Sequence, residues 1–115
     1  MSQHIRLGKK GERLAAQYLI QKGYDILERN YRAGRIEMDI IALKNEVIVF
    51  VEVKARKNAV YALPEEAVNA QKEENLTAVA EAYLQNIDFP HKNVRFDIIS
   101  IIMNPYQFEH FEDVF

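Results

Sequence analysis

Two apolar stretches separated by a short polar turn occupy residues 35–57, and this pattern restricts the possible folds more than any other part of the chain. They read RIEMDIIALK and VIVFVEVKAR. Side chains alternate between the two faces of a strand, so such stretches are typical of neighbouring strands in a sheet. The charged residues in their interiors are Glu37, Asp39, Glu52 and Lys54. We therefore expect each strand to carry its charges on one face.

Strict alternation also makes a definite prediction about the apolar side chains. In the first strand, one face would carry Ile36, Met38, Ile40 and Ala42, and the other would carry Glu37, Asp39, Ile41 and Leu43. In the second strand, the valines would share one face, and the opposite face would carry Ile48, Phe50, Glu52 and Lys54.

The turn decides whether the two sets of charges meet. If Asn45 and Glu46 alone form it, Asp39 lies opposite Glu52, with Lys54 two residues further along the same face. Facing residues of antiparallel strands have Cβ atoms roughly 4.5–5.5 Å apart. Two carboxylates at that distance repel each other unless a positive charge lies between them. Asn tolerates the left-handed backbone of such a turn; a longer loop would move the two acids to a diagonal.

Composition limits the class of protein. The chain has 115 residues, 49% hydrophobic and 28% charged, which predicts one globular domain. It has no cysteine, no apolar signal segment at the N-terminus and no apolar run near the roughly 20 residues of a membrane span. We expect a cytoplasmic protein that does not enter a membrane.

The net charge of −2 hides an uneven distribution. Residues 1–57 carry 12 Lys and Arg against 7 Asp and Glu, whereas residues 58–115 carry 3 against 10. A positive surface beside the central strands would suit a nucleic acid. A mixed, solvated surface is the alternative.

A helix is predicted from about Leu7 to Lys22, because small or apolar residues recur at helical spacing. They are Ile5, Gly8, Ala15, Ala16 and Leu19. Glu12 falls on the same face, where an acid needs a reason. It either serves a site or lies at the edge of the face and pairs with Lys9 or Arg13.

The remaining pattern predicts a strand at residues 24–31, a helix from Pro64 to about Asn86, and a last strand at Asn93–Met103. The order helix, strand, strand, strand, helix, strand is typical of an α/β protein with a mixed sheet flanked by helices. Residues 1–103 would form one domain, and residues 104–115 an aromatic and acidic tail. The three histidines are far apart in sequence, and we expect them at the surface.

Basic residues gather near both ends of the central strands. They are Arg29, Arg32, Arg35, Arg56 and Lys57. Such residues bind phosphates through charge and bidentate hydrogen bonds. They could equally be edge charges that discourage aggregation between strands.

The paired carboxylates favour a site for a hard divalent cation. Mg²⁺ prefers oxygen ligands and binds through one or two carboxylates together with substrate phosphate. Asp39 and Glu52 would be the ligands, Lys54 would stabilise developing negative charge, and Glu12 could complete the ligand shell. The sequence contains no zinc-like spacing of histidines.

These residues resemble a known family. GKKGERLAAQYL around Glu12, RIEMDIIA around Asp39, and VFVEVKAR around Glu52 and Lys54 are similar to the YraN family of small uncharacterised bacterial proteins. The resemblance continues through ALPEEAV, Lys72 and RFD, and so covers nearly the whole chain. That family is related to the archaeal Holliday-junction resolvases and to the restriction-endonuclease-like PD-(D/E)xK nucleases.

The resemblance implies a restriction-endonuclease-like mixed sheet, with Asp39, Glu52 and the backbone carbonyl of Val53 as ligands of Mg²⁺ or Mn²⁺. It implies Lys54 as the catalytic lysine and Glu12 as the helical acid, with Lys72 as a further matching position that we group with the nucleic-acid contacts. Where relatives usually have Gly-Glu, this chain has RIEMD. The strand register therefore decides which of the two acids is the ligand, and the alternation favours Asp39.

Two functions follow from this interpretation. The first is a metal-dependent endonuclease that hydrolyses phosphodiester bonds of DNA, in a branched or structured form, and that could act as a homodimer. The second is a nuclease-fold module that binds nucleic acid or a protein partner without cutting.

Overall fold

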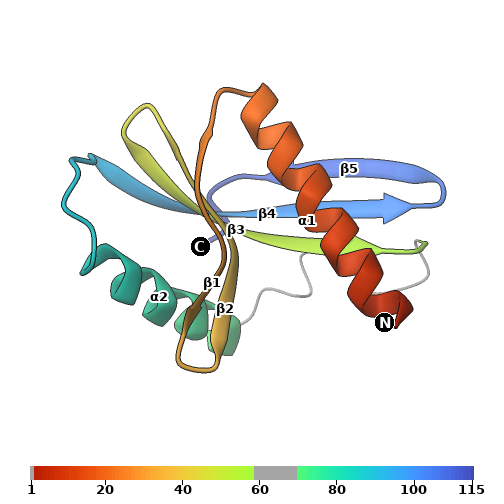
Figure 1. The fold of residues 1–115 in the computed structure, drawn as a ribbon, viewed down its shortest axis with the longest axis horizontal. Coiled ribbons are helices and arrows are strands. Elements are labelled where there is room, and N and C mark those ends of the chain that lie inside the picture. The colour runs from red at the N-terminus through yellow and green to blue at the C-terminus, as the bar shows by residue number, and fades with distance from the viewer. Residues whose placement is uncertain (1, 59–69) are drawn as a thin grey trace.

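One mixed five-stranded sheet with a helix on each face makes up the described part of the chain (Figure 1). The computed structural model describes residues 2–58 and 70–115. In chain order, its elements are α1 (Gln3–Gln21), β1 (Asp25–Ala33), β2 (Ile36–Lys44), β3 (Val47–Arg56), α2 (Ala70–Leu84), β4 (Asn93–Met103) and β5 (Tyr106–Phe111). The strands lie in the order β1-β2-β3-β4-β5, with β3 and β4 parallel and the other neighbours antiparallel. The predicted mixed α/β architecture is confirmed.

The turn between β2 and β3 has the predicted two residues. Asn45 and Glu46 both have positive φ angles, 52° and 65°, which match the right-handed twist of the flanking strands. The ladder runs from the pair Lys44 and Val47 to the pair Ile40 and Val51. Among the described pairs it ends there, one position before the acids.

The alternation along β2 changes phase at Asp39, so the prediction of one continuous face was wrong. Ile40 and Ala42 lie in the core on the α1 side of the sheet, as predicted from their spacing. Met38 and Ile36, however, pack on the α2 side. The physical reason is that the carboxylate of Asp39, rather than a backbone carbonyl, accepts the N–H of Val53 at 2.8 Å. The strand thus leaves the regular ladder where the acids begin.

The C-terminal segment forms part of the sheet. Residues 104–115 were expected to be a tail, but β5 pairs antiparallel with β4, from Met103 and Tyr106 to Ile98 and Phe111. Phe108 packs against the α1-side core, and Phe115 packs on the α2 side. Phe108, Phe111 and Phe115 recur at helical spacing, so their pattern does not indicate a strand. Pairing with β4 decides the conformation.

The two helices differ in detail from their predicted ranges. α1 begins at Gln3, earlier than predicted, because Ser2 caps it by accepting from the N–H of Ile5 at 3.2 Å. Ile5 itself is 52% exposed and takes no part in the buried face. The predicted start of the second helix at Pro64 lies outside the described residues. No helix in the described ranges is long and apolar enough to span a membrane.

Gly11 sets the distance between α1 and β3. A Cβ atom at this position would lie 2.6 Å from Cβ of Ala55, closer than two carbon atoms can approach without strain. The absence of a side chain therefore lets the helix lie directly on the strand. Because Glu12 is the next residue, this close approach also places its carboxylate beside the sheet.

We expect Gly11→Ala to lower the free energy of unfolding by about 1–3 kcal/mol, because the added methyl group forces α1 away from β3. Gly8→Ala is the matched control, since nothing lies within 4 Å of a Cβ atom there. It should stabilise the helix by roughly 0.5–1 kcal/mol. Urea denaturation followed by circular dichroism measures both. Equal effects of the two substitutions would contradict the close contact.

Candidate metal centre

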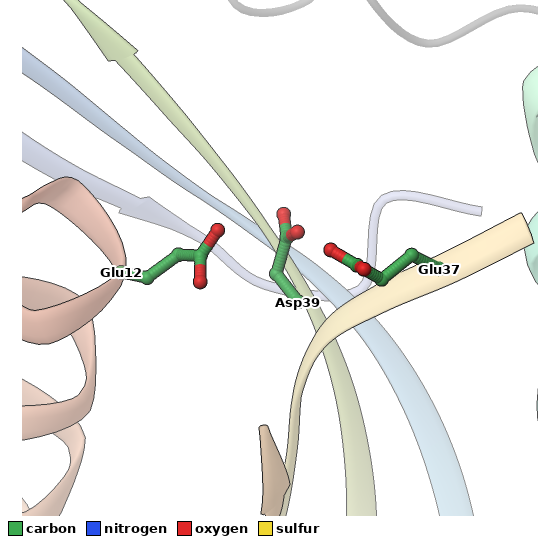
Figure 2. Close-up of side chains that lie close together, drawn as sticks. All are labelled: Glu12, Glu37 and Asp39. Atoms are coloured by element: carbon green, nitrogen blue, oxygen red, sulfur yellow. The ribbon is translucent and has the colours of Figure 1, made fainter. Parts of the chain in front are cut away.

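Three carboxylates from α1 and β2 converge at one place. Glu12, Glu37 and Asp39 each place an oxygen within 4.8 Å of the other two, as Figure 2 shows. We call these three residues the acid cluster. Glu12 comes from the face of α1 that meets the sheet, and the other two come from the first half of β2. Oxygen donors at this spacing are the ligands that a hard divalent cation prefers.

The carboxyl group of Asp39 is held in an environment that disfavours its charge. Its pKa is raised to about 6, chiefly by burial and also by the negative charges of Glu12, Glu52 and Glu37. The hydrogen bond from the Val53 N–H acts in the opposite direction but does not offset them. A bound cation would offset both the energetic cost of burying the charged carboxylate and its repulsion by the neighbouring acids.

Asn30 holds two members of the acid cluster in place. With its amide nitrogen turned towards them, it donates to Glu12 Oε1 at 2.8 Å and to Glu37 Oε1 at 3.2 Å. Its φ angle is 55°, in the left-handed region that Asn tolerates better than most residues. Burial raises the pKa of Glu12, whereas the Asn30 hydrogen bond lowers it.

Glu52 lies on the other side of β3 from Val53. Its carboxylate contacts the ammonium groups of Lys72, at 2.5 Å, and Lys54, at 3.4 Å. Lys72 comes from the first turn of α2, which packs on that face. The side chain of Glu52 is only 9% exposed, and within the described residues Oε2 has no hydrogen-bond partner. This buried oxygen retains a lone pair that a cation could use.

The backbone of Val53 faces the gap between β2 and β3. The N–H and C=O groups of one residue point in the same direction along an extended strand. The carbonyl oxygen of Val53 is therefore directed to the same side as the N–H that donates to Asp39. The structure thus brings Asp39 to the backbone of Val53. Glu52, the predicted partner of Asp39, is not among the three clustered carboxylates, and the described β2–β3 ladder ends before the two acids, but the charge of Glu52 acts on Asp39.

The structure adds residues that the sequence did not assign to the site. Glu37 had been set aside in favour of Asp39, but both reach the acid cluster, because β2 leaves the ladder between them and Ile40. Two acids two residues apart were the available signal. Nothing in the sequence indicated that Asn30 belongs to the site, since its contacts depend on how the backbone of β1 lies beside α1.

The predicted nucleic-acid contacts fall into different surroundings. Arg32 pairs with Glu37 at 3.3 Å, and Lys72 contacts Glu52. Arg35 lies exposed in the turn between β1 and β2, and Arg29 is exposed on β1, where its charge acts on Glu12. At the end of β3, Arg56 has a buried Nε without a hydrogen-bond partner among the described residues, and the next residue, Lys57, is exposed.

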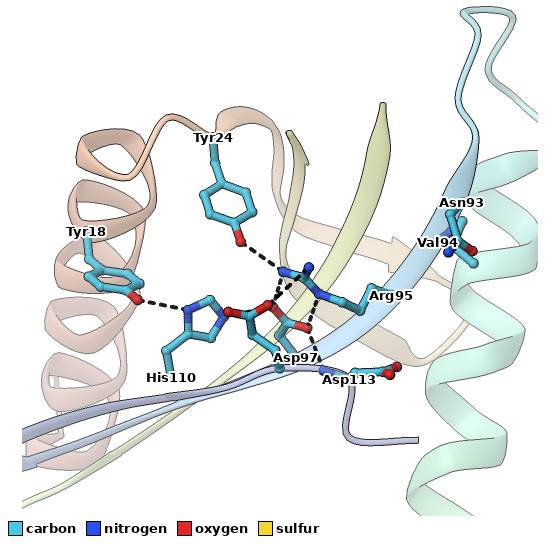
Figure 3. A network of polar contacts seen from close by, with 9 residues as sticks. Tyr18, Tyr24, Asn93, Val94, Arg95, Asp97, His110 and Asp113 are labelled. Carbon is cyan, nitrogen blue, oxygen red and sulfur yellow. Dashed lines mark hydrogen bonds and ion pairs between the residues drawn. The ribbon is translucent and has the colours of Figure 1, made fainter. Parts of the chain in front are cut away.

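A second polar network lies on the α1 side of β4 and β5 (Figure 3). His110 Nε2 lies 2.7 Å from Asp97 Oδ2, and His110 Nδ1 lies 2.9 Å from the hydroxyl of Tyr18. Arg95 donates two hydrogen bonds to Asp97 and one to Tyr24. The side chain of His110 is only 8% exposed, so the expectation of a surface histidine was wrong. The residue is buried because β5 joins the sheet.

Comparison with known sequences places the chain among relatives of the same size. The uncharacterised protein family UPF0102 matches residues 11–101. The chain belongs to this family. A UPF0102 protein of Phocaeicola vulgatus is 45% identical over 120 residues, covering all of this chain and 96% of the relative. UPF0102 proteins of Bacteroides thetaiotaomicron and Dictyoglomus turgidum are 43% and 41% identical, over 100% and 86% of this chain and 96% and 84% of their own lengths.

The UPF0102 match begins at Gly11, immediately before the helical acid, and ends in β4. The matched range therefore includes the acid cluster, Glu52 and its two partners, Lys54 and Lys72. The five-stranded mixed sheet between two helices is consistent with a restriction-endonuclease-like fold.

The raised pKa of Asp39 predicts a stability that falls with rising pH. The folded state holds a proton on this group up to about pH 6, whereas the unfolded chain releases it near pH 3.8. In metal-free buffer, Asp39→Asn should therefore gain up to about 3 kcal/mol relative to wild type between about pH 4 and about pH 8. Urea denaturation with EDTA at both pH values measures this difference. If the difference in free energy of unfolding between Asp39→Asn and wild type were the same at both pH values, the assigned environment of Asp39 would be contradicted.

Proposed function

We propose that this chain is a divalent-metal-dependent nuclease that hydrolyses phosphodiester bonds of DNA. The observation that carries the proposal is Asp39, a half-buried carboxyl group whose charged neighbours among the described residues are further carboxylates. Repulsive groups of this kind destabilise a fold, so they are expected where a charged ligand compensates for them.

The donors fit such an ion. Asp39, with Glu12 or Glu37, supplies carboxylate oxygens, and Oε2 of Glu52, which has no hydrogen-bond partner in the described part of the chain, and the Val53 carbonyl supply further candidates. A bound Mg²⁺ or Mn²⁺ would neutralise charge on a phosphodiester and lower the pKa of a bound water.

The protein's own groups have separate roles in this proposal. The Val53 N–H fixes the orientation of Asp39, and Asn30 fixes Glu12 and Glu37. Lys54 is half-buried on β3 beside Glu52, where its ammonium group can stabilise negative charge that develops on a phosphate. Lys72 holds the other side of Glu52 and is a positioning residue.

One observation favours the second candidate, a nuclease-fold module that binds without cutting. Glu52 already has two ammonium partners, Lys54 and Lys72, which reduce its need for a metal. In that case the acid cluster alone would bind a cation, and no cleavage would follow. The two predictions below separate metal binding from cleavage.

Mn²⁺ should raise the melting temperature of the wild type at pH 8, because a ligand that binds only the folded state stabilises it by about 2.7 kcal/mol at 100 times its Kd. Asp39→Asn should abolish this rise, and Asp25→Asn, at an exposed position of β1, should preserve it. Differential scanning fluorimetry with and without Mn²⁺ measures the shift. An equal rise in melting temperature in both variants would contradict the proposed metal site at Asp39.

Cleavage gives the direct test. With Mn²⁺, the wild type should cut at least one of four DNA probes: a four-way junction, a flap, a single strand or a plasmid. Asp39→Ala and Lys54→Ala should each lower the rate by about 100-fold or more, while binding measured in EDTA changes little. Asp25→Asn again serves as the control. Wild-type protein that binds Mn²⁺ but cuts none of these probes would favour the second candidate.

A further inference from the structure

A continuous groove runs between α1 and β1 and ends at the acid cluster. It consists of two adjoining hollows of about 350 Å³ and about 440 Å³. Both hollows are lined by Lys9, Glu12 and Asn30. Glu37 lines only the first, and Arg13 and Arg29 line only the second. One end of the groove is therefore acidic and the other is basic. We call it the α1–β1 groove.

The cations of the basic end are available to a ligand. Lys9 and Arg13 are four residues apart and so lie on one face of α1, opposite Arg29 of β1. All three side chains are exposed, and none forms an ion pair with a carboxylate in the described ranges 2–58 and 70–115. Arg32, by contrast, is already paired with Glu37.

We infer that the α1–β1 groove binds the phosphodiester backbone of DNA, with Lys9, Arg13 and Arg29 contacting a phosphate next to the one that lies at the acid cluster. This inference rests on the proposed function, since it extends the same site.

The charge pattern favours a polymer of phosphates over a small anion. The second hollow has three cations and one carboxylate, Glu12, whose Oε1 accepts from Asn30. A single anion would be attracted to the basic end only. A nucleic-acid strand can place one phosphate between the cations and the next at the acids, where a divalent ion offsets the repulsion. Arg also supplies the two parallel donors that match phosphate oxygens.

The test measures binding without cleavage. A fluorescein-labelled DNA duplex of random sequence is titrated with protein in EDTA, at salt concentrations from about 50 to about 200 mM. The double variant Lys9→Ala, Arg13→Ala should bind about tenfold or more weakly, with a slope of log affinity against log salt smaller in magnitude by up to about 0.9, the value for one neutralised phosphate. Arg29→Ala should reduce the magnitude of the salt slope by about half as much as the double variant does.

The chain contains a matched control. Arg6 and Lys10 are also one Arg and one Lys, four residues apart and exposed on α1, but they line neither hollow. Arg6→Ala, Lys10→Ala removes the same charge and should leave affinity and salt slope within about twofold of wild type. Circular dichroism of each variant verifies that α1 is intact.

The outcomes separate this inference from the proposed function. If the groove variant loses binding and the control does not, the groove is supported, even where the wild type cuts no DNA. If both pairs weaken binding equally, or if the wild type does not bind the duplex, the groove is excluded, even where Mn²⁺-dependent cleavage is found. The inference would also be overturned, in favour of an acidic protein partner, if binding of a labelled decaglutamate peptide required Lys9 and Arg13 while binding of the duplex did not.

Discussion

The hydrogen bond from the Val53 N–H to the carboxylate of Asp39 controls the geometry of the site. It forms where the β2–β3 ladder ends, and it replaces a bond that a backbone carbonyl would otherwise accept. As a result, β2 changes the direction of its side chains, and Glu37 and Asp39 both reach Glu12 on α1. The same departure leaves the backbone of Val53 facing the acids. A side-chain carboxylate and regular strand pairing thus compete for the N–H of Val53, and the carboxylate accepts it.

The buried Asp97 and the half-buried Asp39 show two different environments for a negative charge in this fold. For Asp97, burial is the largest single effect and would raise the pKa, but hydrogen bonds from His110, Arg95 and the Asp113 N–H together lower it. For Asp39, burial is reinforced by neighbouring acids, and the pKa rises to about 6. Asp97 is satisfied by the protein and stabilises the junction of β4, β5 and α1. Among the described residues Asp39 has no ion pair with a cation, which is why we assign the site to it.

The lysines show a related division. Lys54 and Lys72 lie against Glu52, on the α2 side of β3, whereas Lys9 lies on the opposite side of the sheet and lines the groove beside Glu12. Lysines therefore lie on both faces of the sheet near the acids. In the proposed function, a divalent ion would lie at the acid cluster and phosphates would lie beside these cations. A chain with a net charge of −2 can thus gather three cations, Lys9, Arg13 and Arg29, at one end of the α1–β1 groove.

The sequence by itself determined the elements that local pattern specifies. The two-residue turn at Asn45 and Glu46, the range of β4 and the mixed α/β class all follow from short-range backbone preferences and from apolar periodicity, which each segment carries within it. The resemblance carried by the GER, MD and EVK segments also agreed with the UPF0102 family. Only the tertiary structure decided the phase change at Asp39, the strand β5, the burial of His110 and the groove beside α1. Each of these depends on which groups compete for a hydrogen bond or a charge across the sheet, and such competition involves residues that are distant in the chain.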